Sequence, residues 1–256
     1  MKVKTPIIVA HRGASYKAPE NTIPAFKIAF DEQADFIEGD FWLTVDNEII
    51  CIHDSNTRRV GNKNIRVTSS TLDELKKVDV GIRKGNQFAG TTIPTLQEVL
   101  DIIPEQKGLH LEIKDNREKF LFRLKEILKE SNIPSEKIRI ISFHRNIIRA
   151  AKKYIPDIKA YLIFGWYFSK GNYFKSLARK LITKKIDTVN CDGLVIYSGS
   201  YIEDGFIKAF QSKNLDVCTY NVEDENKAQK LFEFGVDSIT TNSPLMIRKA
   251  IQKLIE

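Results

Sequence analysis

Short apolar runs alternate with longer amphipathic segments along this whole chain of 256 residues, and this alternation constrains the fold more than any other feature. Apolar runs of about four to eight residues between polar boundaries are typical of buried strands, whereas apolar residues spaced by three and four indicate helices. The pattern predicts eight strands, at Ile7–Ala10, Phe36–Trp42, Leu109–Lys114, Ile138–Phe143, Lys159–Ile163, Leu194–Tyr197, Asp216–Tyr220 and Ser238–Thr241.

Most of these strands are followed by a helical pattern. Examples are the apolar spacings Phe120, Leu124, Ile127, Leu128 and Ile247, Ile251, Leu254, Ile255. Ser243-Pro244 offers an N-cap followed by proline at the first helical position. Eight strand-then-helix units in about 250 residues are the size and pattern of an α/β (β/α)8 TIM barrel. We therefore expect one barrel domain over residues 1–256, with a doubly wound open sheet as the alternative.

One segment, residues 54–92, interrupts the alternation. It follows a predicted hairpin with its turn at Asp46-Asn47 and its end at His53, and it is rich in polar, basic and glycine residues. In a TIM barrel the loops after the strands form the catalytic face. We interpret residues 54–92 as an inserted lid subdomain in which substrate selection would occur.

Composition limits the class of protein. Forty basic and 33 acidic residues give a net charge of +7, which agrees with anionic or phosphate-bearing partners. Three cysteines without CxxC spacing exclude a disulfide framework and a cysteine-rich zinc site. No apolar stretch approaches the ~18 residues of a membrane span, and the N-terminal apolar run is too short for a signal peptide. These features predict a soluble, cytoplasmic protein.

Two histidines lie at the ends of predicted strands, on the face of the barrel where catalytic residues are expected. His11 directly follows the first predicted strand, and His53 ends the hairpin. A histidine that titrates near neutrality can take or give a proton, so a pair on opposite sides of a scissile bond can divide the acid and base roles. His110 and His144 are interpreted as barrel filling and as a surface or capping residue.

Three acidic residues are expected to converge inside the barrel. Side chains alternate along a strand, so Glu38 and Asp40 point to one side of the second strand and Glu112 points to the polar side of the third. Carboxylates that repel one another at a buried position are relieved by a hard, oxygen-preferring cation. This arrangement predicts a Ca²⁺ or Mg²⁺ site, and zinc fits less well.

Basic side chains accompany these carboxylates. Arg12 and Lys114 are placed beside the predicted metal, where a phosphate needs countercharge. Neutralisation of the carboxylates by these two residues alone, without metal, is the alternative. The sequence has no nucleophile elbow, Walker-type loop or dinucleotide fingerprint. A metal, two basic residues and two histidines therefore favour cleavage of a phosphodiester.

Short motifs also follow one another in a recognisable order. They are His11-Arg12-Gly13-Ala14-Ser15, Pro19-Glu20-Asn21-Thr22, Glu38-x-Asp40, Thr44-x-Asp46 and His53-Asp54, with Ile93–Leu100, Leu111–Lys114, Ser142-Phe143 and Thr219–Asn221 further along the chain. This series resembles the glycerophosphodiester phosphodiesterase family over essentially the whole chain. The first 54 residues are the most specific part of the resemblance.

The resemblance implies a TIM barrel with a small inserted subdomain. It also implies hydrolysis of a glycerophosphodiester to sn-glycerol 3-phosphate and an alcohol. The site residues it implies are Glu38, Asp40 and Glu112 for a divalent cation, His11 and His53 as the acid/base pair, Arg12 for the phosphate and Glu20 as an orienting group. In the family's mechanism one histidine helps a glycerol hydroxyl attack phosphorus, and water opens the resulting cyclic phosphate.

Three positions depart from the family pattern. Gly39 replaces a bulky apolar residue, so we expect weaker packing on the outside of the barrel. Cys218 occupies a place often taken by tryptophan, which would alter the substrate pocket. Asn242-Ser243 replaces the common Asp-Tyr, so we expect an orienting interaction to be missing.

Parts of the sequence are also compatible with other functions. An aromatic rim at Phe164–Phe168 and the basic helix that follows could serve a lysophospholipase D-like or phosphatidylinositol-specific phospholipase at anionic membranes, although a solvated basic face is favoured. A non-catalytic binding barrel is less consistent with the complete set of site residues. The basic residues are dispersed, which does not favour nucleic-acid binding. The expected partner is a small-molecule glycerophosphodiester, and no feature specifies an oligomeric state.

Overall fold

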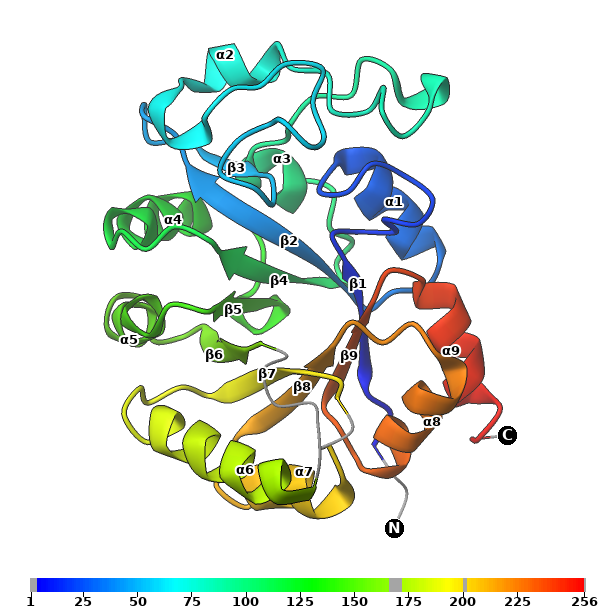
Figure 1. Ribbon diagram of the computed structural model, residues 1–256. Coiled ribbons are helices and arrows are strands. Elements are labelled where there is room, and N and C mark those ends of the chain that lie inside the picture. The colour runs from blue at the N-terminus through cyan, green and yellow to red at the C-terminus, as the bar shows by residue number, and fades with distance from the viewer. Residues whose placement is uncertain (1–3, 166–171, 200–201, 256) are drawn as a thin grey trace.

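The computed structural model describes residues 4–165, 172–199 and 202–255, with only the backbone of residues 172–178. Its strands form one sheet that closes on itself (Figure 1). They are β1 (Ile7–His11), β2 (Phe36–Leu43), β3 (Ile49–Cys51), β4 (Gly108–Ile113), β5 (Ile138–Ser142), β6 (Lys159–Phe164), β7 (Gly193–Tyr197), β8 (Asp216–Tyr220) and β9 (Ser238–Thr241). Because β1 pairs in parallel with both β2 and β9, the sheet is a closed barrel and the open-sheet alternative is wrong.

The helices surround the barrel, as the predicted alternation requires (Figure 1). They are α1 (Ile23–Asp31), α2 (Leu72–Lys76), α3 (Leu96–Leu100), α4 (Lys119–Glu130), α5 (Arg145–Tyr154), α6 (Asn172–Ile186), α7 (Asp204–Gln211), α8 (Glu225–Glu233) and α9 (Pro244–Gln252). Only α2 belongs to the segment between β3 and α3. The other helices connect successive strands or follow the last one.

Local sequence explains where these helices begin and end. Thr22 caps α1 by accepting a hydrogen bond from the backbone N–H of Ala25, and Thr95 forms a capping box with Glu98 at α3. Pro244 begins α9 as predicted, but the side chain of Ser243 makes no capping hydrogen bond. The apolar stripe predicted to continue through Leu254 and Ile255 is wrong, because α9 ends at Gln252 and these two side chains are 43% and 56% exposed.

Alternating side chains divide each barrel strand between two environments. Ile37, Phe41, Leu111 and Ile113 are buried in the main core between the sheet and the outer helices. Towards the barrel interior, a smaller cluster consists of Ile141, Tyr161, Ile163, Val195 and Cys218. His110 is buried among these strands with edge-to-face contacts to Phe36 and Tyr161, at ring distances of 5.6 and 6.4 Å. His110 and Cys218 therefore fill the barrel.

Gly39 does not weaken the outer packing, contrary to expectation. A Cβ atom at this position would lie 3.0 Å from Cys51 Sγ, 3.1 Å from Phe41 Cε2 and 3.3 Å from Phe26 Cζ. The neighbouring aromatic rings and the thiol thus occupy the space that a larger side chain would fill.

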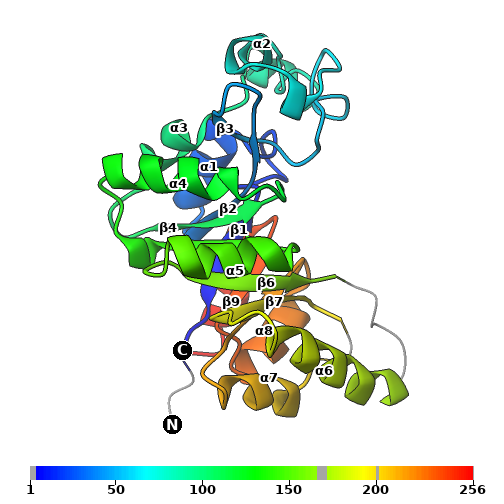
Figure 2. The ribbon, with the colours of Figure 1, turned by 90° about the vertical axis from the view of Figure 1, so that its left-hand side faces the viewer.

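Residues 54–92 extend beyond the end of the barrel at which β2 terminates (Figures 1 and 2). The hairpin beneath them pairs Leu43 with Ile49 and Phe41 with Cys51. A small apolar cluster joins the segment to the residues on either side of it, and it consists of Ile50, Ile52, Val67, Leu75, Val78, Val80 and Ile93. The carboxylate of Asp79 accepts hydrogen bonds from the backbone of Gly81, Ile82 and Gly90 and so fixes its last loop.

The proposed aromatic rim lies partly outside the described residues, which exclude 166–171. Of its two described members, Phe164 is buried in the main core and therefore cannot offer an exposed lip. Lys170 and the side chains of Phe174, Lys175 and Leu177 also fall outside the description. None of the described helices is long and apolar enough to cross a membrane.

Candidate active site

Glu38, Asp40 and Glu112 converge at neighbouring positions on β2 and β4. Asp40 and Glu112 are partners in the parallel pairing of these strands. One carboxylate oxygen from each of the three residues lies within 4.8 Å of the others. Glu38 and Asp40 are buried, and Glu112 is partly buried. The convergence predicted from strand alternation is therefore confirmed.

The three carboxylates titrate unequally because they share one buried space. Burial, Asp40 and Glu112 together raise the pKa of Glu38 well above its usual range. Burial and Asp40 raise the pKa of Glu112 to about 7. Burial alone would raise the pKa of Asp40 as well, but the nearby charges of Lys114 and Arg12 lower it.

Basic side chains compensate this acidic cluster only in part. Arg12 Nε lies 3.2 Å from Asp40 Oδ2, and Lys114 Nζ lies 2.8 Å from Glu112 Oε1 and 3.4 Å from Asp40 Oδ1. Glu38 Oε2 accepts a hydrogen bond of 2.9 Å from the backbone N–H of Arg12. The other oxygen of Glu38, Oε1, is buried and has no hydrogen-bond partner within the described residues.

An unpartnered buried carboxylate oxygen beside two further carboxylates fits a divalent cation. A buried carboxylate oxygen without a hydrogen bond destabilises the folded state, unless a ligand replaces the water molecules that the oxygen lost on burial. Three carboxylates without a cysteine or histidine among them are the donors that Ca²⁺ and Mg²⁺ prefer. The residues present thus fit the predicted cation better than neutralisation by Arg12 and Lys114 alone.

The loop after β1 places Arg12 beside this cluster by an unusual backbone turn. Arg12 and Gly13 both have positive φ angles, of 56° and 80°. A Cβ atom at residue 13 would lie 2.7 Å from the backbone of Ala25, so only glycine allows α1 to approach so closely. Hydrogen bonds hold the turn, because Glu38 accepts from the Arg12 N–H and the Arg12 carbonyl accepts from Asn21 N at 3.0 Å.

Asn21 is a site residue that the sequence pattern did not single out. Its Nδ2 donates to Asp40 Oδ2 at 2.8 Å, and its Oδ1 accepts from Asp40 N at 3.1 Å. The residue is buried and also has a positive φ, of 57°. Asn21 belongs to the Pro19-Glu20-Asn21-Thr22 motif, but its place just before a helix usually indicates a capping role. Asn21 therefore orients a carboxylate of the acidic cluster.

His11 is oriented by Asn242, at a position where the sequence departs from the family pattern. His11 Nδ1 lies 2.8 Å from Asn242 Oδ1, which also accepts a hydrogen bond of 2.8 Å from Ser15 Oγ. An amide oxygen only accepts, so Nδ1 carries the proton and Nε2 is free to accept one. The expectation of a missing interaction is wrong. Burial and Arg12 lower the pKa of His11 to about 4, which leaves it neutral at pH 7.

His53 has a carboxylate partner instead of an amide. Its Nδ1 lies 2.7 Å from Asp54 Oδ1, and its backbone carbonyl accepts a hydrogen bond of 3.1 Å from Trp42 Nε1. Burial lowers the pKa of His53, while Asp40 and the hydrogen bond to Asp54 oppose that change. Of the two histidines, only His53 has a carboxylate hydrogen-bonded to its ring among the described residues, and this carboxylate of Asp54 stabilises the protonated form of His53.

A cavity of about 470 Å³ opens beside His11. It is lined by His11, Arg12, Ser15, Tyr16, Glu20, Lys84, Asn221 and Asn242. The set contains one tyrosine, Tyr16, and Lys84 comes from the segment 54–92. The lining is therefore polar, with three groups from the predicted site.

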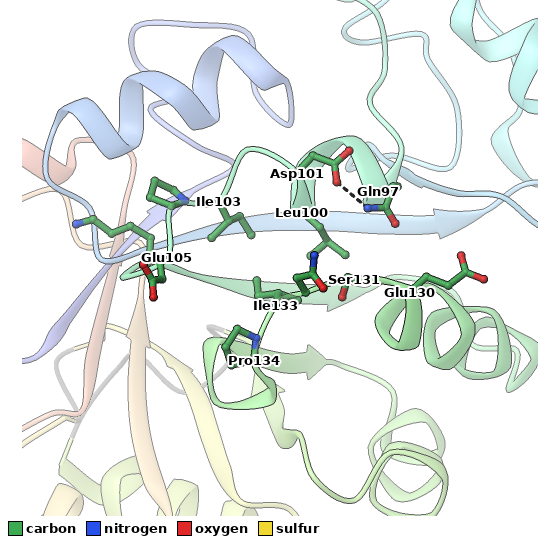
Figure 3. Close-up of a pocket in the computed structure, with 12 residues that line it drawn as sticks. Gln97, Leu100, Asp101, Ile103, Glu105, Glu130, Ser131, Ile133 and Pro134 are labelled. Atoms are coloured by element: carbon green, nitrogen blue, oxygen red, sulfur yellow. Dashed lines mark hydrogen bonds between the residues drawn. The ribbon is translucent and has the colours of Figure 1, made fainter.

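A second cavity, of about 540 Å³, lies at the opposite end of the barrel (Figure 3). Leu100, Ile103, Ile133 and Pro134 line it, and Gln97 donates a hydrogen bond to Asp101 at its edge. It contains none of the predicted site residues.

The eight predicted site residues lie in one connected region. His11, Arg12 and Glu20 line the polar cavity, the three carboxylates lie beneath Arg12, and Lys114 bonds two of them. His53 is close enough for Asp40, Lys114 and Arg12 to influence its pKa. Residues that the pattern missed are Asn21 and the orienting groups Ser15, Asp54 and Arg59.

Comparison with known proteins identifies the family of this chain. The family model for the glycerophosphoryl diester phosphodiesterase family matches residues 11–246. The chain therefore belongs to this family, and it is a phosphoric diester hydrolase.

Individual relatives agree with this assignment. A glycerophosphodiester phosphodiesterase of Caldanaerobacter subterraneus subsp. tengcongensis is 40% identical over 166 residues, which cover 62% of this chain and 66% of that protein. A putative glycerophosphodiester phosphodiesterase of Bacillus subtilis is 32% identical over 256 residues, covering 94% of this chain and 96% of the relative.

Solved structures extend the similarity to three dimensions. A phosphodiesterase of Oleispira antarctica, solved in complex with the product sn-glycerol-3-phosphate, superposes with a TM-score of 0.83 and 26% identity, covering 96% of this chain and 97% of that one. The glycerophosphodiester phosphodiesterase of Thermotoga maritima has a TM-score of 0.74 at 19% identity over 96% of this chain and 98% of its own, and shares the fold.

Proposed function

We propose that this enzyme hydrolyses glycerophosphodiesters of small polar alcohols to sn-glycerol 3-phosphate and the free alcohol, with Ca²⁺ or Mg²⁺ bound. The observation that carries the proposal is the arrangement of His11 and His53 around an acidic cluster that fits a divalent cation. The product-bound structure of the Oleispira antarctica relative supports glycerol 3-phosphate as a ligand of this fold.

The polar cavity supports the choice of a small alcohol. Its lining offers hydrogen-bonding groups and one tyrosine, and its volume of about 470 Å³ suits a short diester. Apolar surface for an acyl chain would have to come from elsewhere, and Phe164 is buried. We further propose that residues 54–92 act as the lid, because Lys84 of this segment lines the cavity and donates to the Ser15 carbonyl at 2.7 Å.

In the proposed mechanism, proton transfer is divided between the histidines. His11 Nε2 accepts the proton of the glycerol 2-hydroxyl, whose oxygen attacks phosphorus, because His11 is neutral and its Nδ1–H is held by Asn242. His53 donates a proton to the departing alkoxide, and Asp54 stabilises its charged form. The P–O bond to the alcohol breaks and leaves a cyclic phosphodiester, which water opens with the two histidine roles exchanged.

The remaining groups compensate charge. Arg12 holds the phosphate and is itself held by Glu20 at 3.0 Å, while Lys114 adds a second positive charge. Glu38, Asp40 and Glu112 would hold the cation. When bound, it would stabilise the negative charge that develops on the phosphoryl oxygens.

The test is release of glycerol 3-phosphate from a panel of diesters of choline, ethanolamine, glycerol and inositol, together with lysophospholipids. Reactions contain Ca²⁺, Mg²⁺ or chelator. We expect cation-dependent release from the short diesters, a loss of at least about a hundredfold in kcat for His11→Ala, and little change for His144→Ala at the start of α5. Release from lysolipids alone would replace the proposal with a lipase function. No release despite bound cation would indicate a non-catalytic barrel.

A further inference from the structure

Arg59, in the segment between the hairpin and α3, connects two loops that each carry predicted catalytic groups. Its Nε donates to Asp54 Oδ2 at 2.7 Å. Its Nη1 and Nη2 donate to the two oxygens of Glu20, also at 2.7 Å each. One guanidinium group thus binds one carboxylate from the loop after β1 and one from the loop after β3.

Each of these carboxylates bonds a group that acts on the substrate in the proposed mechanism. The other oxygen of Asp54 lies 2.7 Å from His53 Nδ1. Glu20 Oε1 also accepts from Arg12 Nη1 at 3.0 Å. Arg12 in turn lies 3.2 Å from Asp40. A continuous series of hydrogen bonds and ion pairs therefore leads from His53 through Arg59 to Arg12 and the acidic cluster.

The geometry of this connection requires arginine. A guanidinium group is planar and always charged, and it presents its donors in a rigid fork that matches carboxylates on two sides. A lysine ammonium in the same place is a point charge without fixed directions. The Arg59 side chain is 46% exposed, so its ion pairs add little to the free energy of unfolding. Its effect is expected in the relative position of the two loops.

We propose that Arg59 is a positioning residue that holds the loops of His53 and Arg12 at the spacing needed for phosphodiester cleavage. The inserted segment then contributes to the rate of the reaction in addition to covering the cavity. This inference rests on the proposed function of the site. The two can fail separately. The proposed function fails if the wild type cleaves no diester, whereas the role of Arg59 fails if the wild type cleaves a diester and the Arg59 variants cleave it equally well.

Steady-state kinetics of Arg59→Met, Arg59→Lys and Arg59→Ala test the proposal. The matched control is Arg58→Met, which removes the same charge from the adjacent exposed residue. A displacement of about 1 Å in a catalytic group can cost on the order of a hundredfold in rate. We expect kcat of Arg59→Met to fall about ten- to a hundredfold with less than about a threefold change in KM, and Arg59→Lys to recover little of it. Arg58→Met should keep the wild-type kcat.

Chemical rescue separates positioning from folding. Added guanidinium ion at millimolar concentration should restore part of kcat in Arg59→Ala and leave Arg58→Met unchanged. Thermal unfolding of each variant is recorded in parallel. Equal kcat values for Arg59→Met and Arg58→Met would overturn the proposal. So would a loss in Arg59→Ala that follows a lower melting temperature and that guanidinium does not restore.

Discussion

Asn242 is an amide at a position where a carboxylate would also be able to hold His11. The amide oxygen fixes the Nδ1–H tautomer at 2.8 Å but adds no negative charge to stabilise a protonated ring. Burial therefore dominates, and the pKa of His11 falls to about 4. A base with so low a pKa stays neutral in mildly acidic solution.

The substitution Asn242→Asp tests this account. A carboxylate beside Nδ1 stabilises the imidazolium form and should raise the pKa of His11 by about one to three pH units. The proposed base must be neutral, so the acidic limb of the kcat/KM profile should move to higher pH by the same amount. Profiles of kcat/KM between pH 4 and 9 measure the change.

The control for that profile is Asn221→Asp, which adds the same charge to the wall of the same cavity. It should move the acidic limb by less than Asn242→Asp does, because no hydrogen bond joins its side chain to the His11 ring in the described structure. An equal shift of the acidic limb in both variants would mean that added negative charge anywhere in the cavity changes the pKa of His11. The hydrogen bond from His11 to residue 242 would then have no special effect on that pKa.

The carboxylates of the site could be predicted from sequence, and their orienting partners could not. Glu38, Asp40 and Glu112 follow from strand alternation, which is a local property. The partner of His11 lies 231 residues away, and only the closure of the barrel brings it close. Asn21 and Arg59 likewise act through side chains that no spacing rule connects.

At the scale of elements, Lys84 is the clearest contribution of the segment 54–92 to the cavity. The segment packs on the hairpin through the small apolar cluster, and Asp79 accepts three backbone hydrogen bonds within it. Lys84 then reaches the Ser15 carbonyl at 2.7 Å. Its ammonium group adds positive charge where an anionic diester would enter.

The substitution Lys84→Met should therefore weaken substrate binding more than turnover. We expect KM for a short glycerophosphodiester to rise about three- to tenfold, as for the loss of about 1 kcal/mol from an exposed charge, with kcat within about twofold of wild type. Lys63→Met, at another exposed lysine of the segment, is the control. A fall in kcat with unchanged KM would contradict this role.

Most strands and helices follow from the sequence, because apolar periodicity determines which faces can be buried. All eight barrel strands lie at the predicted positions to within one residue at each end. The predicted end of α9 is wrong because Leu254 and Ile255 continue the apolar spacing without a surface to pack against. The loop structure of residues 54–92 depends on single side chains such as Asp79, for which periodicity carries no information.

At the scale of the whole molecule, the acidic cluster makes the cation-free protein less stable as pH rises. The pKa of Glu112 is about 7 in the fold, against an ordinary value of 4.5. The folded state therefore holds more protons than the unfolded state between these values, and the free energy of unfolding falls as pH rises through that window. For one group this is on the order of 3 kcal/mol.

In chelator, the melting temperature of the wild type should accordingly fall between pH 5 and pH 8. The melting temperature of Glu112→Gln should fall less over the same range. At pH 8, Glu112→Gln should melt above the wild type in chelator. Cation at about a hundred times its Kd should stabilise the wild type by about 2.7 kcal/mol, or roughly 5–10 °C, and the variant much less. Thermal scans with and without cation make the comparison.

Glu130→Gln, at an exposed carboxylate ending α4, is the control for these scans and should behave as the wild type. If cation raised the melting temperature of Glu112→Gln as much as that of the wild type, Glu112 would not belong to the cation site. If the pH dependence persisted in Glu112→Gln, its origin would lie in other groups.

The bond between His11 and Asn242 joins the first and last strands of the barrel, and this gives the site a fixed order of completion during synthesis. The three carboxylates, both histidines and Arg59 all lie within the first 112 residues, so the ribosome synthesises them first. Asn242 emerges only when β9 is complete. A growing chain thus contains every predicted cation ligand long before it contains the side chain that fixes the His11 tautomer. The proposed proton transfer by His11 would therefore require the last strand to be in the sheet.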